Sequence, residues 1–405
     1  MNNDIYAFRN PDSGSPSDSG LLAGIRMVLQ PNVSVHRWTT TAGTRALEGY
    51  RALEDATVVQ RLKASGALLV GTTRMSELGF GITGDTIQQA FAAGHCDAAL
   101  VLDMLGEGRH SAAKAGLFGY KPSYGICSRL GLIGLIPSME SISVIASSAH
   151  LAVPIMDTVA GVDSQDFSML WENLPDFGRA STSSIASTRI GVIKEQIDEL
   201  DQEEKEAFQA ALLTLNSTGL STTELSFPDW PLFRIVHQVV GSTEASSSAG
   251  KYDSVRYGHR ASGADTWNDM YIKSRAESFG RLIKAYLFQG AYFQFKNYPA
   301  FEEACRSRQV LVQQSKDLFD RVDILALPTC RARYDAAHAA TIADVYNAFS
   351  LTVMANVIGA PSATLPHLVT IGDTELGLQL IGRHLDDVRL LSVALQVSEL
   401  QERDY

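Results

Sequence analysis

The sequence is poor in cysteine and has no long apolar run. Its four cysteines are scattered over 405 residues, with neither the C-x-x-C spacing of a metal site nor the density of a secreted disulfide scaffold. No stretch reaches about 18 continuous apolar residues, and the polar start MNNDIYAFRNPDSGSPSDSG lacks the basic-then-apolar order of a signal peptide. We therefore expect reduced core thiols in a cytoplasmic protein, with no metal site and no membrane segment.

A basic face is also missing. The formal net charge is −11, and no dense run of Lys and Arg occurs. A nucleic-acid or anionic-membrane partner needs such a face, so we predict neither. The 45% apolar and 20% charged residues are ordinary for a soluble globular protein. We expect a small-molecule substrate, no cofactor, and either a homodimer or another protein partner.

The beginning of the chain differs in composition from the rest. Residues 9–20 form a Pro/Ser/Gly/Asp stretch that buries too little apolar surface to order itself. We therefore predict a mobile N-terminal segment over 1–20 and a folded domain over 21–405. Beyond it, helical patterns alternate with apolar strands: Asp55 is placed as the N-cap and Gly66 as the C-cap of a helix that leads into ALLVGTT. This alternation is typical of a layered α/β sheet.

A Ser/Thr-rich tract, ASTSSIAST at 180–188, comes before a new apolar strand, RIGVI. It marks two halves of the domain, 21–179 and 189–405, joined by this linker. Apolar strands return at DILALPTC and GLQLIG. We expect these last strands to close the sheet.

Six stretches, which cover most of the chain from about residue 31, carry a resemblance to a known family. They are TTAGTRALEGY (40–50), EDATVVQRLKASGALLVGTTRMSELGFG (54–81), GLFGYKPSYGICSRLGLIGLIPSMESI (116–142), EASSSAGKYDSVRYG (244–258), RAESFG (275–280) and GLQLIG (377–382). Together they resemble the amidase signature family, and within it most the A subunit of tRNA-dependent glutamine amidotransferases. The resemblance implies a single large α/β/α domain whose mixed central sheet is flanked by helices.

That family uses a Ser-(cis)Ser-Lys arrangement, in which a neutral lysine, relayed through a second serine, deprotonates the nucleophilic serine. Backbone N–H groups of a glycine-rich loop hold the developing oxyanion. A gap-free count from the turn at 119–123 places Glu107 on the nucleophile, and a count from Ala92 places Thr83 on the relay serine. The stretch VSVHRW places His36 on the lysine.

All three matched positions depart from the family pattern, and Leu105 and Gly106 stand where the family has a glycine pair. A carboxylate cannot perform serine acyl transfer, so we do not expect ordinary amidase activity. Glu107 is either a general acid/base or cation-stabilising group with a raised pKa, or a product of drift. His36 is either its proton-transfer partner or a loop histidine. Thr83 either hydrogen-bonds in the pocket or merely ends a strand.

Other positions concern substrate binding. Tyr252, Arg256 and Tyr257 match a family segment that lines the substrate cavity, although the same residues also serve to pack the two halves together. Where the amidotransferase relatives carry arginines that bind the α-carboxylate of their substrate, this chain has Ala285 and Tyr286. We count Tyr286, together with Leu105 and Gly106 of the loop, among the candidate substrate-binding residues. Without a bidentate partner for that carboxylate, glutamine is not the expected ligand.

Ser111 and Lys114, which follow the loop, offer a different chemistry. Ser111 lies four residues beyond Glu107, so one helical turn directs it either toward the pocket as a shifted nucleophile or away from it. Lys114 replaces an aromatic residue in an apolar stretch and is either paired or exposed.

The leading hypothesis is a repurposed enzyme that uses Glu107-centred acid/base chemistry in a cyclisation, elimination or isomerisation of a small, biosynthetic substrate. One alternative is an inactive pseudo-amidase that serves in binding or assembly of a larger complex. The other is a residual amide hydrolase with a shifted nucleophile. Fold alone does not decide among them.

Overall fold

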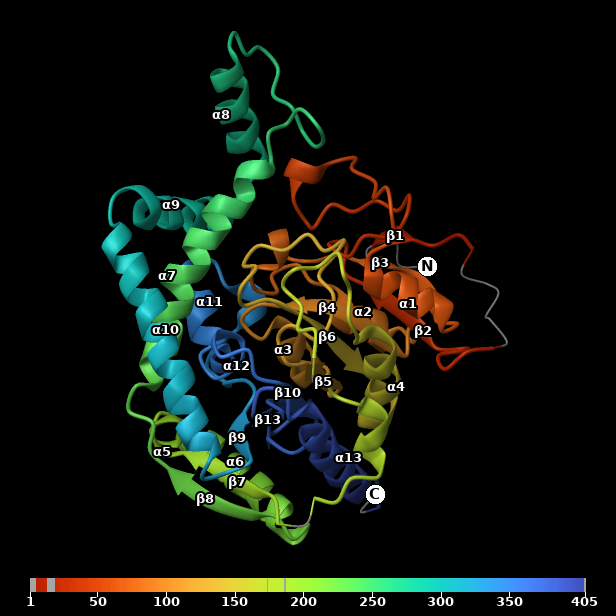
Figure 1. The fold of residues 1–405 in the computed structure, drawn as a ribbon, viewed down its shortest axis with the longest axis vertical. Helices are drawn as coiled ribbons and strands as arrows, with labels where there is room; N and C mark the ends of the chain where they lie inside the picture. The colour runs from red at the N-terminus through yellow and green to blue at the C-terminus, as the bar shows by residue number, and fades with distance from the viewer. Residues whose placement is uncertain (1–4, 13–18, 173, 186, 404–405) are drawn as a thin grey trace.

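The computed structural model describes residues 5–12, 19–172, 174–185 and 187–403. Over these residues one large sheet runs through the whole chain (Figure 1). Its strands, in spatial order, are β1 (Tyr6–Arg9), β3 (Leu68–Thr73), β2 (Arg26–Leu29), β4 (Ala98–Asp103), β6 (Ser141–Ala146), β5 (Phe118–Lys121), β10 (Ser362–Leu365), β13 (Leu378–Gly382), β9 (Ile324–Pro328), β7 (Arg189–Ile193) and β8 (Ser221–Leu225). A separate small hairpin consists of β11 (Thr370–Ile371) and β12 (Thr374–Glu375).

Helices surround this sheet. They are α1 (Thr57–Ala64), α2 (Ile87–Ala92), α3 (Glu107–Lys114), α4 (Ala149–Val159), α5 (Lys194–Asp198), α6 (Gln202–Ser217), α7 (Trp230–Ser248), α8 (Trp267–Ser278), α9 (Arg281–Phe295), α10 (Tyr298–Phe319), α11 (Ile342–Ala348), α12 (Val353–Val357) and α13 (Asp387–Arg403). Figure 1 shows α8 projecting beyond the body of the molecule, with α7, α9 and α10 along one side.

The sheet is mixed. Parallel pairs join β2 to β3 and β4, and β7 to β8 and β9, whereas the strands between them pair antiparallel. On β9, Ile324 and Ala326 join one apolar cluster, and the alternate residues Leu325 and Leu327 join another on the opposite side. Successive strand residues point to opposite faces, so both faces of the sheet are covered. The predicted α/β/α architecture is confirmed.

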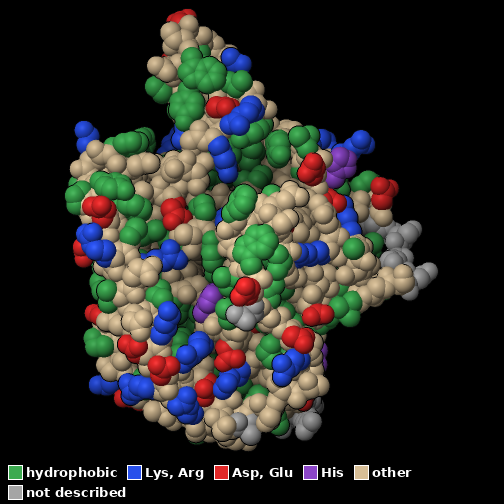
Figure 2. Space-filling model, viewed as in Figure 1, with side chains coloured by type: hydrophobic (Ala, Val, Ile, Leu, Met, Phe, Trp, Pro, Cys, Tyr) green, Lys and Arg blue, Asp and Glu red, His purple; other side chains and the backbone are tan. Residues whose placement is uncertain are grey.

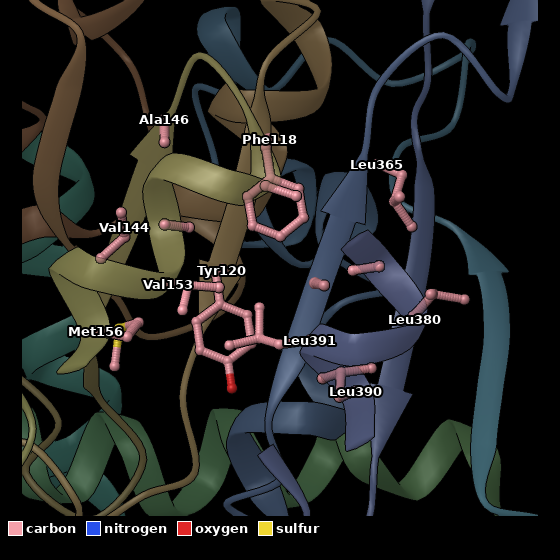
Figure 3. Packing of buried hydrophobic residues seen from close by; sticks show 14 of the residues in the cluster. Phe118, Tyr120, Val144, Ala146, Val153, Met156, Leu365, Leu380, Leu390 and Leu391 are labelled. Carbon is pink, nitrogen blue, oxygen red and sulfur yellow. The ribbon is translucent and has the colours of Figure 1, made fainter. Parts of the chain in front are cut away.

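Part of one buried apolar cluster lies where β5 meets the C-terminal strands (Figure 3). Phe118 and Tyr120, two residues apart on β5, are fully buried with Leu380 of β13 and Leu391 of α13. Burying each such side chain contributes about 1.5–3 kcal/mol. The Tyr120 hydroxyl remains satisfied because it donates to Asp387 at 2.7 Å.

The N-terminal part differs from the predicted mobile segment. Tyr6–Arg9 form β1, which pairs antiparallel with β3 at the edge of the sheet. The composition of 9–20 gave no sign of this, because the pairing partner lies more than 60 positions away. Residues 1–4 and 13–18, also in that prediction, lie outside the described residues.

The two predicted halves share one sheet. Ser362 to Thr364 of β10 pair with Lys121 to Gly119 of β5, which joins the first half directly to the second. In the predicted linker 180–188, Ala180 and Ile185 are buried, and residue 186 lies outside the described residues. Among the described residues, no helix has both the length and the apolar character to cross a membrane.

Candidate active site

The loop after β4 is the centre of the candidate site. The strand ends at Asp103, and α3 begins at Glu107 after a three-residue turn. Gly106 in that turn has φ 122°, a conformation that L side chains rarely adopt. A Cβ on Gly106 would also lie 2.2 Å from the hydroxyl oxygen of Thr352. The close approach of this turn to α12 therefore requires glycine.

The turn wraps its backbone N–H groups around the side chain of Glu107. Glu107 Oε2 accepts hydrogen bonds from the N–H groups of Met104 at 2.8 Å, Leu105 at 2.7 Å and Gly106 at 3.2 Å. Glu107 Oε1 accepts another from the N–H of Gly81 at 3.3 Å. The side chain is 2% exposed. An acidic residue in the first helical turn also has a favourable interaction with the helix dipole. The Glu107 carboxylate thus occupies an anion-binding site formed by backbone N–H groups.

The ionisation of Glu107 reflects two opposing influences. Burial raises its pKa to about 7, and the neighbouring Asp103 carboxylate adds to the rise. The backbone N–H groups of Leu105 and Met104 lower the pKa in return. For Asp103, burial also favours the neutral form, but the charge and hydrogen bonds of Arg109 overcome it and hold the pKa below its ordinary value.

Asp103 and Arg109 form a fully buried, two-pronged ion pair beside the loop. Arg109 donates to Asp103 through Nη2 at 2.9 Å and through Nε at 3.0 Å. Its Nη1 donates to the carbonyl of Thr352 at 3.0 Å and to Gln379 Oε1 at 2.7 Å, while Nη2 also donates to Asn356. Buried charges are tolerated only when paired and hydrogen-bonded in this way. The pair thereby connects the loop to α12 and β13.

A second buried network reaches the loop from the other helices. His237 Nε2 lies 2.9 Å from the carbonyl oxygen of Met104, and its Nδ1 lies 2.9 Å from the Tyr346 hydroxyl. That hydroxyl lies 3.0 Å from the Tyr286 hydroxyl. Because a carbonyl only accepts, we assign the ring proton to Nε2, and Nδ1 then accepts from Tyr346. Burial lowers the pKa of His237 to about 3, so the ring is neutral at ordinary pH.

Both tyrosines of this network lie within electrostatic reach of Glu107. Burial first, and the Glu107 carboxylate in addition, raise the pKa values of Tyr286 and Tyr346. Tyr286 also stacks on Phe80 with 4.3 Å between ring centroids. Tyr286 was predicted from the sequence as a binding residue, but His237 and Tyr346 were missed. The only sequence signal for His237 is a histidine within the apolar helix pattern WPLFRIVHQVVG.

The structure does not bring His36 or Thr83 to Glu107. His36 is exposed, and its Nδ1 lies 2.6 Å from the carbonyl oxygen of Leu53. Thr83 is exposed as well and donates to the carbonyl of Ala339 at 3.4 Å. In the part of the chain that the structure describes, neither side chain has a hydrogen bond to Glu107. A catalytic role for these two residues stays a prediction without support from their contacts.

The predicted binding residues Tyr252, Arg256 and Tyr257 contact one another instead of the loop. Tyr252 is buried and packs edge-on against Tyr257 and Phe279, with 6.4 and 6.0 Å between ring centroids. Arg256 is exposed, donates to Asp253 at 3.0 Å and lies over the Tyr257 ring. Tyr257 also packs edge-on against Tyr50 of the first half, with 5.5 Å between ring centroids. These contacts are of the kind expected if the segment packs the two halves together, and a role in substrate binding stays a prediction.

The remaining predicted residues lie on or after the loop. Leu105 is fully buried, and its N–H contributes to the arrangement around Glu107. Ser111 is buried within α3, and Lys114 is partly buried at the last turn of that helix.

Comparisons with known proteins place this fold and loop in a family. A family model described as Amidase matches residues 7–87 and 89–391. The chain therefore belongs to the amidase family. The A subunit of the glutamyl-tRNA(Gln) amidotransferase of Natronomonas pharaonis is 31% identical over 414 residues, which cover 95% of this chain and 97% of that relative. The resemblance proposed from the six stretches is confirmed at this level.

Solved structures show the same fold. The A subunit of the glutamyl-tRNA(Gln) amidotransferase from Thermotoga maritima superposes with a TM-score of 0.78 at 22% identity, covering 96% of this chain and 86% of that one. A chain from a vestigial protein complex, described as revealing the origins of an s-triazine catabolic enzyme, superposes with a TM-score of 0.79 at 24% identity. It covers 96% of this chain and 86% of that one.

The predicted function was wrong. Relatives about 30% identical over most of the chain are named as the A subunits of amidotransferases, which are amidase-type proteins. Nothing in the comparisons indicates a new reaction, an inactive chain or a shifted nucleophile. The physical reason lies in the surroundings of Glu107. A residue 2% exposed, with both carboxylate oxygens bound by backbone N–H groups, has no open side from which to exchange protons with a substrate.

Proposed function

We propose that this chain is an amidase-family subunit that takes part in amide-nitrogen transfer together with a second protein. The observation that carries the proposal is the match over 97% of the length of a relative named as one component of an amidotransferase. A match of this extent involves the sheet, the loop and the outer helices together. The proposal concerns amide chemistry carried out by a complex, with this chain as one component.

The loop at 104–106 supports the amide chemistry. In amide transfer, negative charge develops on the carbonyl oxygen, and converging backbone N–H groups stabilise it. Here the N–H groups of Met104, Leu105 and Gly106 already converge on one oxygen atom of Glu107. A substrate oxygen can use these donors only after the Glu107 carboxylate has moved away. We therefore expect the described conformation to be a closed one.

The test begins with the chain tagged in its own host and purified under gentle conditions. Light scattering coupled to size exclusion should give a mass above the 43.9 kDa of one chain, with a second polypeptide in fixed ratio. Ammonia release from glutamine and from other primary amides is then measured with the complex. The same measurement on the partner alone serves as the control, and it should give no release.

Two results would overturn the proposal. If the purified chain is a lone 43.9 kDa species at every salt concentration, it does not work as part of a complex. If a complex forms but releases no ammonia from any amide, or if the partner alone releases it equally fast, this chain does not contribute amide chemistry.

A further inference from the structure

Helix α9 exposes an apolar face that nothing in the described structure covers. Phe288, Tyr292 and Phe295 follow one another at i, i+4 and i+7, so they lie on one side of the helix. Their exposed fractions are 75%, 53% and 75%. The opposite side of α9 is buried through Ile283 and Tyr286. A helix that is apolar on two faces buries one of them in the core. When the second apolar face is exposed to solvent, it indicates an interaction surface.

This face continues onto α8 through a groove of about 360 Å³. Ile272 of α8 and Phe288 of α9 both line the groove, and Tyr271, Phe279 and Leu287 line it with them. Figure 2 shows hydrophobic side chains gathered on the projecting part of the molecule, with charged side chains of both signs beside them. The docking groove, as we call this feature, is therefore apolar at its centre and has cations at its margin.

The charged residues of the docking groove are Arg275 and Lys284, both cations. The Arg275 guanidinium lies 5.0 Å from the ring centroids of Tyr271 and Phe279, so its position is fixed. The surrounding segment 251–296 has eight Lys and Arg against four Asp and Glu, in a chain whose net charge is −11. This local excess of positive charge contrasts with the acidic remainder of the chain.

We propose that the docking groove binds an amphipathic helix of the protein partner, with apolar anchors in the groove and acidic residues against Arg275 and Lys284. This inference rests on the proposed function, in which the chain works with a second protein. Helices bind apolar grooves through anchors spaced i, i+3 or i+4 and i+7, and opposite charges at the margin set partner choice. A second copy of this chain is a poorer occupant, because it would bring basic margins together.

The experiment uses two labelled peptides of equal length and helical design. Both carry leucines at i, i+4 and i+7, and their flanking positions are glutamate in one peptide and lysine in the other. Fluorescence anisotropy with the full chain should show at least tenfold tighter binding of the glutamate peptide. Lys284→Glu should remove this preference, and Phe288→Ser should weaken binding of the glutamate peptide at least tenfold.

A matched control is Leu213→Ser. Leu213 is 70% exposed on α6, outside the docking groove, so its removal should leave peptide affinity unchanged. Circular dichroism confirms that each variant is folded. Equal affinity for both peptides, no binding of either, or equal losses in Phe288→Ser and Leu213→Ser would overturn the proposal. A dimer of the chain that dissociates in Phe288→Ser would also overturn it, because a second copy would then cover the groove.

The outcomes separate this inference from the proposed function. If a partner co-purifies equally well with wild type and with Phe288→Ser, the proposed function stands and the docking groove is not the interface. If no partner co-purifies while the glutamate peptide binds as expected, the groove is real and the proposed function fails.

Discussion

The side chain of Glu107 accepts a hydrogen bond at 2.7 Å from the backbone N–H of Leu105, two residues before it. The side chain of the first residue of α3 therefore folds back and contacts the turn that precedes the helix. Each donor that this carboxylate satisfies is a buried N–H group, and such groups are costly to leave without a partner. The first predictions follow from this contact.

Removing the carboxylate should destabilise the fold. Glu107→Ala leaves the N–H groups of Met104, Leu105 and Gly106 without acceptors, so we expect a loss of about 2–4 kcal/mol in the free energy of unfolding. Glu107→Gln keeps one acceptor oxygen and should lose less, about 1–2 kcal/mol. Urea denaturation measures both. Glu203→Ala, on the exposed side of α6, is the control and should change stability by no more than about 0.5 kcal/mol. A Glu107→Ala protein as stable as this control would contradict the stated role.

The pH dependence of stability should carry the signature of Glu107. Its pKa rises from an ordinary 4.5 to about 7 in the fold, so between these values the folded state binds more protons than the unfolded state. Stability contributed by this group therefore decreases as pH rises through that window and is constant above it. Buried His237, with a pKa lowered to about 3, acts in the opposite sense, because stability falls as pH drops below the unfolded value.

The two effects are separated by subtraction. The unfolding free energy of wild type and of Glu107→Gln is measured from pH 4.5 to 8. The stability of wild type relative to Glu107→Gln should decrease as pH rises to about 7. A difference that stays constant over this range would show that Glu107 has an ordinary pKa.

Breaking the buried ion pair should cost more than any surface change. Asp103→Ala leaves the Arg109 guanidinium buried without its carboxylate, and we expect a loss of about 3–5 kcal/mol. Adding Arg109→Met to this variant should cost less than the sum of the two single changes, because the uncompensated charge is then gone. Chemical denaturation of the four proteins forms a double-mutant cycle. Additive losses would mean that the pair is not coupled.

The two glycines Gly106 and Gly84 offer a matched test of the turn. Both have positive φ, 122° and 79°, but a Cβ on Gly106 meets Thr352 whereas one on Gly84 meets nothing within 4 Å. Gly84→Ala should therefore cost only the backbone strain, about 1–2 kcal/mol. Gly106→Ala should cost about 2 kcal/mol more, since overpacking is added. Equal losses would show that the turn can move away from α12.

Local patterns and the family resemblance were enough to predict the fold class and the position of Glu107. Apolar strands with helical segments between them predicted a layered sheet, and the strand ending at Asp103 and the glycine-flanked Glu107 are visible in the sequence itself. The helix over Thr57–Ala64 was also expected, although Asp55 does not cap it. The Asp55 carboxylate accepts hydrogen bonds from Lys63 and from the backbone N–H of His36 instead.

The surroundings of Glu107 were decided only by the tertiary structure. His237 meets the Met104 carbonyl across 133 positions, and Arg109 meets Gln379 across 270. The alignment with the family motifs placed Glu107, His36 and Thr83 in one predicted site. Such an alignment carries no information on the direction in which a side chain points. Likewise, β1 is ordered by pairing with a distant strand.

The sequence by itself therefore determined which local segments become strands, helices and turns, because period and turn residues act between near neighbours. Only the packed fold decided that the Glu107 carboxylate would be enclosed by backbone amides and that the aromatic face of α9 would stay exposed. Burial depends on every element that covers a residue, and those elements come from the whole length of the chain.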